Sequence, residues 1–339
     1  MRETLYSIRN LTVDYHTRLG NLRAVDNVSL DIQRGEILGL VGESGCGKST
    51  LGKALLRMIQ DPGEISNGEL WFNGLGRNWY DGSNLMDLSD AQMREVRGKS
   101  ISMIFQDPMT SLNPVQKIVD HLTETIQTHE PTVSNKAARA RANELVVRLG
   151  IRDERINDYP HQLSGGMRQR VMIALALSLN SDLIIADEAT TSLDVIVEAQ
   201  FLDILRNLCV EFDLTILLIT HNIGIVAQMA NRVAVMYAGR LAELGEVHDV
   251  FKRTLHPYAD GLLKAVPNIL MDEDELYKME GSPPNLIAPP PGCRFHPRCP
   301  RVMEICSQRV PPLVEQGEQH YTACWLYEDS LESEEVAAS

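Results

Sequence analysis

The chain has 339 residues, 44% of them hydrophobic and 23% charged, which predicts a soluble protein with one large domain and an extension, or two domains. Its formal net charge of −14 argues against a general binder of DNA or RNA backbones, which attract positive surfaces. No apolar run approaches the length that spans a bilayer, and the first residues lack the apolar core of a signal peptide, so we expect a cytosolic protein.

The first part of the chain predicts strands, a glycine-rich loop and a helix, in that order. A loose alternation of apolar and polar residues predicts a strand over Leu5–Tyr15, and a second strand is expected over Asp26–Ile32. A short apolar segment at residues 36–41 reads as a buried strand, and residues 51–59 have helical apolar spacing. The segment Gly42–Thr50 lies between them and contains three glycines, so we expect a loop.

This loop fits the phosphate-binding pattern G-x-x-x-x-G-K-[ST], in the strand–loop–helix context that the pattern requires. Backbone N–H groups and the positive end of the helix can then bind phosphate oxygens. Lys48 is expected at the β- and γ-phosphates, and Ser49 as a ligand of Mg²⁺. A chance match of a glycine-rich turn is the alternative. The predicted ATP contacts are Gly42, Ser44, Gly45, Cys46, Gly47, Lys48, Ser49 and Thr50.

Further strands and helices alternate downstream, which favours a parallel α/β core with helices on both faces. The expected strands are Glu69–Gly74, Ser102–Phe105, Leu183–Ala186, Thr215–Ile219 and Val233–Tyr237. The expected helices cover residues 91–96, 135–149, 171–179 and a stripe of Phe201, Leu205, Leu208 and Phe212, with Cys209 as a small core residue beside it. Such sheets bind ligands beyond the carboxyl ends of their strands, where Gln106, Asp187, Glu188 and His221 are expected.

The pair Asp187-Glu188 follows four apolar residues at a predicted strand end. Asp187 is placed to orient Mg²⁺, and Glu188 to polarise an attacking water. An ordinary acidic loop is the alternative.

Leu163–Met167 closely matches the LSGGQ signature, and here the chain resembles the ATP-binding subunits of ABC transporters. The resemblance implies further roles for residues in the same order along the chain. Tyr15 is the aromatic that stacks on the base, although from the residues alone it is equally a strand-edge cap. Gln106 is the Q-loop residue and a Mg²⁺ ligand with Ser49 and Asp187, Glu188 is the catalytic carboxylate, residues 192–194 form the D-loop, and His221 is the switch histidine. The implied catalytic residues are thus Glu188, His221 and Gln106.

The signature residues Ser164, Gly165 and Gly166 are then expected to meet the γ-phosphate of a nucleotide held by another subunit. The implied fold is the P-loop NTPase ABC ATPase fold, with a parallel core sheet, an antiparallel β subdomain and a helical subdomain at about residues 110–180. We expect an ATP-binding domain over residues 1–253, a cysteine-containing extension over 254–326 and an acidic, disordered tail over 327–339.

Three segments resemble the oligopeptide/dipeptide/nickel importer branch, and most of all the D-type subunit of dipeptide permeases. They are Asp107–Pro114, Leu255–Tyr258 and Gly292–Pro300. The resemblance implies ATP-driven closure and hydrolysis-driven opening of a two-ATPase sandwich that powers import of a peptide or similar solute. Its partners would be an F-type sister ATPase, two polytopic membrane permease subunits at the cytoplasmic face of the membrane and, indirectly, an extracytoplasmic solute-binding protein, with no nucleic acid. Ala189 and Asn222 depart from the usual Pro and Asp.

The proline-rich extension contains Cys293, Cys299, Cys306 and Cys324, separated by five, six and 17 residues. Four thiolates suit zinc or an iron–sulfur cluster, and the spacing is not the short knuckle of structural zinc. Some relatives with this extension resemble carriers of a [4Fe–4S] cluster, which favours that cofactor over zinc. We expect the bound metal group to have a structural role, holding the extension in place, and redox sensing is the alternative.

Two other classes of function stay open at this point. One is a soluble ABC ATPase in nucleic-acid repair or translation, which the single ATPase domain and the absence of a long coiled-coil pattern oppose. The other is a vestigial nucleotide-binding subunit that senses redox state, which the intact Lys48 and Glu188 oppose.

Overall fold

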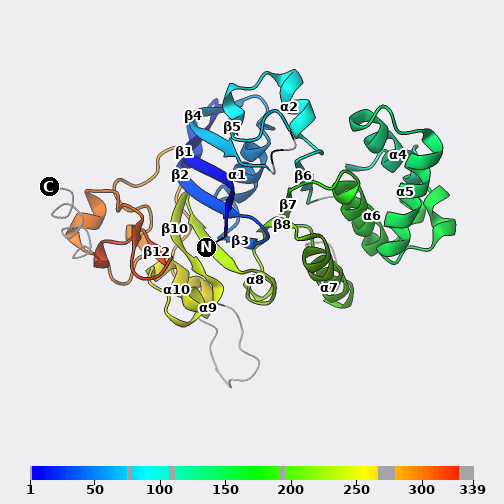
Figure 1. The fold of residues 1–339 in the computed structure, drawn as a ribbon. Coiled ribbons are helices and arrows are strands. Elements are labelled where there is room, and N and C mark those ends of the chain that lie inside the picture. The colour runs from blue at the N-terminus through cyan, green and yellow to red at the C-terminus, as the bar shows by residue number, and fades with distance from the viewer. Residues whose placement is uncertain are drawn as a thin grey trace. The chain divides into compact units, whose positions relative to one another are not determined.

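The computed structural model describes residues 2–74, 76, 78–106, 111–190, 195–265 and 279–327, without the side chains of 195, 210 and 212. Contacts within the chain divide it into two compact units (Figure 1). The first unit takes its described residues from the ranges 1–5, 32–35 and 72–218, and the second from 6–31, 36–71 and 219–339.

The first unit is mainly helical. Its helices are α2 (Asp90–Val96), α4 (Ile118–His129), α5 (Asn135–Arg148), α6 (Gly165–Leu177) and α7 (Val195–Phe212). Its strands are β5 (Ser83–Asn84), β6 (Ile101–Ile104), β7 (Leu183–Asp187) and β8 (Thr215–Ile219), the last residue of which belongs to the second unit. The helices α4, α5 and α6 pack against one another, and they occupy the part of the chain where a helical subdomain was predicted.

The predicted helix starts are explained by their caps. Ser89 and Gln92 form a capping box at α2, and the Ser134 hydroxyl accepts a hydrogen bond from Ala137 at α5. The prediction for the next helix was wrong at its start, because α6 begins at Gly165 rather than at residue 171. Ser164 caps α6, so the polar signature residues form the first turn of the helix. The apolar residues from 171 onward continue the same helix.

The strands β6 and β7 pair in parallel, with Ile101 opposite Leu183 and Ile104 opposite Ala186. Every residue of β7 is buried, as expected for a central strand written as a continuous apolar run. The carboxyl ends of the two strands therefore lie side by side, and this places the residues that follow them together.

The second unit contains most of the β-structure. Its strands are β1 (Thr4–Thr17), β2 (Gly20–Gln33), β3 (Ile37–Val41), β4 (Gly63–Phe72), β9 (Arg232–Tyr237), β10 (Arg240–Glu246), β11 (Val314–Glu315) and β12 (Tyr321–Thr322), the ends of β1, β2 and β4 reaching into the first unit. Its helices are α1 (Lys48–Leu55), α8 (Ile223–Met229), α9 (Val247–Lys252) and α10 (Pro257–Lys264).

The strands of this unit belong to two sheets. In one, β1 lies between β2 and β4. In the other, β3 pairs in parallel with β9, β9 pairs antiparallel with β10, and β12 pairs antiparallel with both β10 and β11. The predicted parallel arrangement therefore holds for β3 and β9, while β10 to β12 add an antiparallel edge that sequence analysis missed.

The extension shares a hydrophobic core with the strand that leads into the glycine-rich loop. Tyr258 and Phe295 of the extension are buried with Val41 of β3 and Tyr237 of β9. The Tyr237 ring centre lies 4.5 Å from that of Tyr258 and 5.2 Å from that of Phe295. Aromatic rings bury large apolar areas, so this cluster fixes the extension to the second unit.

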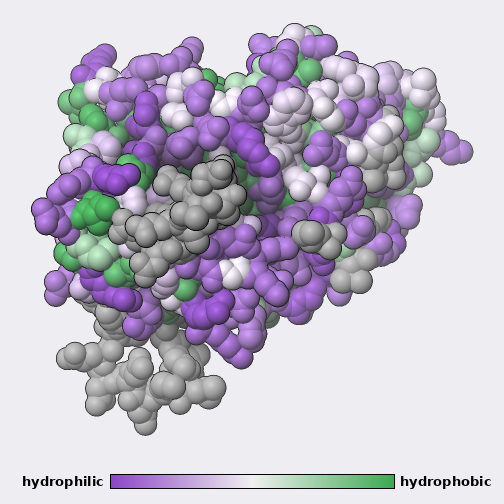
Figure 2. Space-filling model, turned by 60° about the vertical axis from the view of Figure 1, so that its left-hand side comes forward, coloured by the Kyte–Doolittle hydropathy of each residue, from purple (hydrophilic) through white to green (hydrophobic). Residues whose placement is uncertain are grey.

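The face shown in Figure 2 is mostly hydrophilic, with small separate hydrophobic patches. Large exposed apolar side chains are scattered over the described residues, as with Leu19, Val115 and Ile196. None of the helices among the described residues combines the length and the hydrophobicity that a membrane crossing requires.

Candidate functional site

The glycine-rich loop joins β3 to α1 in the second unit, and two of its glycines are required by close packing. A Cβ atom on Gly42 would clash with the carbonyl oxygen of Met236, and one on Gly47 with that of Ala24. Gly47 also has φ 106° and caps α1. Ser44 and Gly45 are exposed at the tip of the loop. The loop can thus present its backbone to a ligand while its two ends are held by neighbouring strands.

Lys48 is already held within this loop. Its side chain is buried, with the whole residue 4% exposed, and its Nζ donates hydrogen bonds to the carbonyl oxygens of Gly42 at 2.8 Å and Glu43 at 3.1 Å. A buried ammonium needs such acceptors, and they keep its charge beside the loop backbone. The closely packed glycines, the N-terminus of α1 and the fixed ammonium of Lys48 make this loop suited to bind the phosphates of a nucleotide.

Cys46 fills a small space under the loop. It is 5% exposed, and desolvation raises the pKa of its thiol. We therefore expect the thiol to react slowly, because it is rarely ionised.

Tyr15 and His221 lie in the same unit as the loop. Tyr15, on β1, is partly buried, and its ring lies over Gly63, where a Cβ atom would clash with it. Thr220 donates its N–H to the Leu40 carbonyl at 3.2 Å, which holds the segment leading into His221 against β3. Asn222, where the family usually has Asp, still caps α8, because its side chain accepts the Gly224 N–H at 3.0 Å.

In the first unit the adjacent ends of β6 and β7 bring Gln106 and Glu188 together. The Gln106 amide donates a hydrogen bond from Nε2 to Oε2 of Glu188 at 2.9 Å. Asp187 is the last residue of β7 and is buried, whereas Glu188 has φ 47°, a left-handed conformation that is uncommon outside glycine. Strained backbone of this kind gathers at functional sites. The next residue, Ala189, accepts a hydrogen bond from the Gln169 amide through its carbonyl.

The signature starts α6 in the same unit. The Ser164 hydroxyl accepts the Met167 N–H at 3.3 Å, and Arg168 donates to the Leu163 carbonyl at 2.9 Å. Gly165 and Gly166 form the first turn, as expected for a helix N-terminus that binds an anion. The D-loop residues 192–194 and residues 107–110 of the importer-like run lie outside the described residues.

The four cysteines of the extension are free thiols. The Cys293 N–H donates to the Cys306 carbonyl at 2.8 Å. Desolvation raises the pKa of the Cys293 and Cys324 thiols to about 11 each, and the charges of neighbouring cysteines add to this rise. Among the described residues, no group of three or more His, Cys, Asp or Glu side chains is arranged to hold a metal ion.

Three residues were not predicted as site residues: Glu43 within the loop, and Tyr258 and Arg298, which contact it. The signals in the sequence were the importer-like segments Leu255–Tyr258 and Gly292–Pro300, and in the second of these Arg294 and Arg298 flank Phe295 and Pro297. Their partners could not be predicted, since Glu43 is 255 residues away from Arg298.

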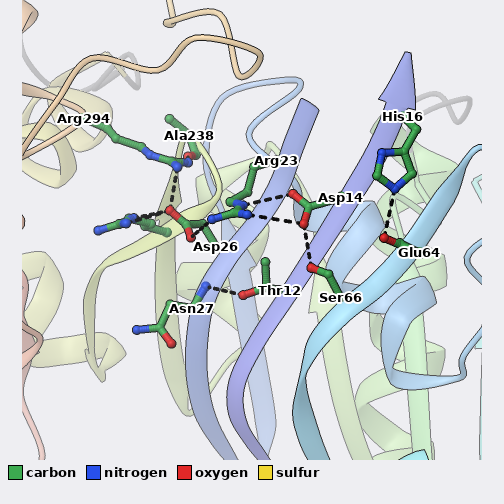
Figure 3. A network of polar contacts seen from close by, with 11 residues as sticks. Thr12, Asp14, His16, Arg23, Asp26, Asn27, Glu64, Ser66, Ala238 and Arg294 are labelled. Carbon is green, nitrogen blue, oxygen red and sulfur yellow. Dashed lines mark hydrogen bonds and ion pairs between the residues drawn. The ribbon is translucent and has the colours of Figure 1, made fainter. Parts of the chain in front are cut away.

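The first arginine of that segment forms a separate anchor. Arg294 donates to Oδ2 of Asp26 at 2.5 Å and also to the Ala238 carbonyl (Figure 3). Arg240 donates to the same carboxylate oxygen at 2.7 Å, and Arg23 bridges Asp26 and Asp14. The extension is therefore tied to β2 by a largely buried ion cluster.

Comparisons with known proteins agree with this geometry. Residues 25–191 match the family described as ABC transporter, and residues 242–306 match the family described as oligopeptide/dipeptide transporter, C-terminal region. A dipeptide transport ATP-binding protein of Bacillus subtilis (strain 168) is 43% identical over 97% of this chain and 97% of its own length. An oligopeptide transport ATP-binding protein of the same strain is also 43% identical, over 95% of this chain and 88% of its own length.

A solved structure is similar in fold. It is a dimeric ATP-binding cassette in a post-hydrolysis state bound to ADP and Pi, with a TM-score of 0.63 and 27% identity, and it covers 71% of this chain and 98% of that one. The predicted ABC ATPase fold is confirmed. The chain therefore belongs to the ATP-binding proteins of ABC transporters, within them to those with the oligopeptide/dipeptide transporter C-terminal region, and it is an ATPase of that family.

Proposed function

We propose that this ATPase powers the import of a peptide or a similar small solute. The observation that carries the proposal is the 43% identity, over 97% of both chains, to a protein named for dipeptide transport. A second relative is named for oligopeptide transport, and both families match this chain in the expected order. The two rival classes, a nucleic-acid or translation ATPase and a vestigial redox sensor, have no comparable support.

The site residues have the following proposed roles. Mg²⁺-bound ATP would supply the phosphoanhydride bond that is hydrolysed. Lys48 and the N–H groups of the loop would bind its phosphates, while Ser49 and Asp187, with Gln106, would hold the metal. Glu188 would orient a water and accept its proton, with His221 beside the γ-phosphate. The glycine packing, the helix start and the carbonyl-bound Lys48 all support this assignment.

We propose a composite site made by two ATPase subunits. The chain carries one P-loop and one signature, and Ser164 to Gly166 start a helix that can bind a phosphate from outside the chain. The similar solved structure is a dimer that holds ADP and Pi. An F-type sister ATPase is the proposed partner, together with two membrane permease subunits at the cytoplasmic face and an extracytoplasmic solute-binding protein.

The proposed domain division assigns residues 1–253 to the ATP-binding domain, with the helical subdomain at about 110–180, and 254–326 to the extension. Support comes from the second family, which matches residues 242–306. The predicted tail, 327–339, lies outside the described residues except for Tyr327, whose hydroxyl donates to the Leu255 carbonyl at 3.2 Å.

The transport proposal is tested in vesicles that contain the purified complex of this chain with its membrane subunits. A labelled dipeptide should accumulate only with Mg²⁺ and ATP, and Lys48→Ala should abolish uptake by removing a phosphate contact. Lys53→Ala is the matched control, because Lys53 lies exposed on the same helix α1. Unchanged uptake in Lys48→Ala would overturn the proposed site. If no membrane subunits purify with the chain, a soluble ATPase becomes the better reading.

We also propose that Cys293, Cys299, Cys306 and Cys324 bind a [4Fe–4S] cluster, with zinc as the alternative. The proposal is supported by four free cysteines in one segment with little regular structure, whereas the described side chains are not gathered into a metal site. Anaerobically purified protein should be brown, and Cys→Ser at any of the four should bleach it. Cys46→Ser and Cys209→Ser are the controls that should keep the colour. Colourless protein with one zinc per chain would exclude the iron–sulfur cluster.

A further inference from the structure

Glu43 lies inside the P-loop, yet its side chain is bound by the extension. The Arg298 guanidinium forms a two-pronged ion pair with it, in which each nitrogen, Nη1 and Nη2, lies 2.9 Å from a separate carboxylate oxygen. Such paired charge-assisted hydrogen bonds fix the orientation of both groups. The carboxylate is therefore neutralised on the side of the loop where the extension packs.

The backbone of Glu43 is fixed as well. Its N–H donates to the hydroxyl oxygen of Tyr258, on α10, at 2.8 Å. Its carbonyl oxygen accepts the Lys48 ammonium at 3.1 Å and the Cys46 N–H at 3.2 Å. Glu43 thus links two side chains of the extension directly to the lysine proposed to bind phosphate.

Arg298 is itself held rigidly. Only 7% of its side chain is exposed, and it donates to the Tyr237 hydroxyl at 3.2 Å and to the Glu280 carbonyl at 3.0 Å. Its guanidinium lies 5.8 Å and 6.0 Å from the ring centres of Tyr237 and Phe295, within the range of cation–π attraction. These contacts fix the orientation of the guanidinium that pairs with Glu43.

We infer that Arg298 and Tyr258 are positioning residues for the nucleotide, acting through Glu43. An unpaired carboxylate in a loop that accepts a triphosphate would repel it, and a displaced Glu43 carbonyl would release Lys48. The extension therefore does more than attach to the ATPase core: it prepares the P-loop for a polyanion. This inference rests on the proposed ATP site at Lys48.

The test measures the affinity of the full chain for Mg²⁺ with the β,γ-imido analogue of ATP, by titration calorimetry. Arg298→Ala should weaken binding roughly tenfold, because it leaves a partly buried carboxylate unpaired beside the phosphates. Glu43→Gln should change the affinity by less than about threefold, because the amide carries no charge. The double variant Glu43→Gln/Arg298→Ala should recover most of the loss, since the repelling charge is gone. A purely structural anchor would show no such rescue.

Lys264→Ala is the matched control, because it removes an exposed ion pair of the extension, with Asp260 at 2.8 Å, away from the loop. Tyr258→Phe tests the second contact and should also weaken binding. Unchanged affinity in Arg298→Ala, or a loss that Glu43→Gln does not rescue, would overturn the inference. If Arg298→Ala does not fold, Arg298→Lys replaces it, and unchanged affinity in that variant and in Tyr258→Phe would be equally contrary.

Lys48→Ala separates this inference from the proposed function. If Lys48→Ala binds the analogue normally, the ATP site itself is misplaced. If it abolishes binding while Arg298→Ala has no effect, the site stands and only the positioning role fails.

Discussion

Glu188 combines a left-handed backbone with a hydrogen bond from Gln106. The bond gives the carboxylate a defined direction, and the amide beside it is the residue expected to respond to the γ-phosphate. A displacement of Gln106 would therefore change the hydrogen bond to the proposed base. This offers a simple physical link between nucleotide state and the helices that follow β6.

We predict that Glu188→Gln keeps nucleotide affinity but lowers turnover at least about a hundredfold, because the amide cannot accept a proton from water. Phosphate release by the assembled complex gives the turnover, and calorimetry gives the affinity. Glu144→Gln, an exposed change on α5, is the matched control. Normal phosphate release by Glu188→Gln would remove this residue from the proposed chemistry.

The Asp26 cluster is a stability feature at the same scale. Asp26 and Arg294 are each 7% exposed at the side chain, and removing Asp26 takes away the carboxylate that pairs with the buried Arg294 charge. Asp26→Ala should lower the free energy of unfolding by about 3 kcal/mol, measured by urea unfolding. Asp260→Ala breaks only an exposed pair with Lys264, and it should lower that free energy by less than about 1 kcal/mol. Equal losses in the two variants would show that the cluster is not buried in solution.

At the scale of elements, α10 depends on a histidine that must stay neutral. His256 caps the helix, with its Nδ1 accepting the Tyr258 N–H at 3.0 Å, and burial lowers the pKa of its imidazole to about 4. The ordinary value is about 6.5, so the unfolded chain binds this proton more readily than the folded one. The contribution of His256 to stability is therefore complete above pH 6.5 and falls as the pH drops from 6.5 toward 4.

We predict that unfolding free energy falls by roughly 3 kcal/mol more between pH 7 and pH 4 in the original chain than in His256→Asn. Asparagine can accept the same capping bond but does not titrate. Burial also lowers the pKa of His129, which adds loss of the same sign in both proteins. The difference between the two pH profiles isolates His256, and parallel profiles would contradict its neutral burial.

At the scale of the whole molecule, the composite site predicts that one chain's signature touches nucleotide held by its partner. A chain carrying Lys48→Ala, paired with an unchanged partner ATPase, should still be labelled at Ser164 to Gly166 by a photoreactive ATP bound to that partner. Mass spectrometry locates the label. Equal labelling of the Lys48→Ala chain and of the Lys53→Ala control chain would support the composite site. Loss of the signature label in Lys48→Ala alone would mean that each chain closes on its own nucleotide.

The sequence determined the class of this protein because the residues expected to bind and hydrolyse ATP lie in short contiguous segments. The P-loop, the signature at Ser164 and the apolar strand before Asp187 depend on local backbone geometry and capping, which nearby residues control. The strands β3, β7, β8 and β9 were also predicted, since buried strands read as continuous apolar runs. The apolar spacing alone was misleading about the start of α6, which lies at Gly165 rather than at residue 171.

The tertiary structure decided what joins these runs. Strand β12 completes an antiparallel edge on β10, and Arg298 reaches Glu43 across 255 residues, although neither pairing leaves a pattern in the sequence. Gln106 meets Glu188 because parallel pairing of β6 and β7 aligns their ends. Contacts between residues distant in the chain depend on the packing of whole elements, so only the folded structure shows that the extension acts on the P-loop.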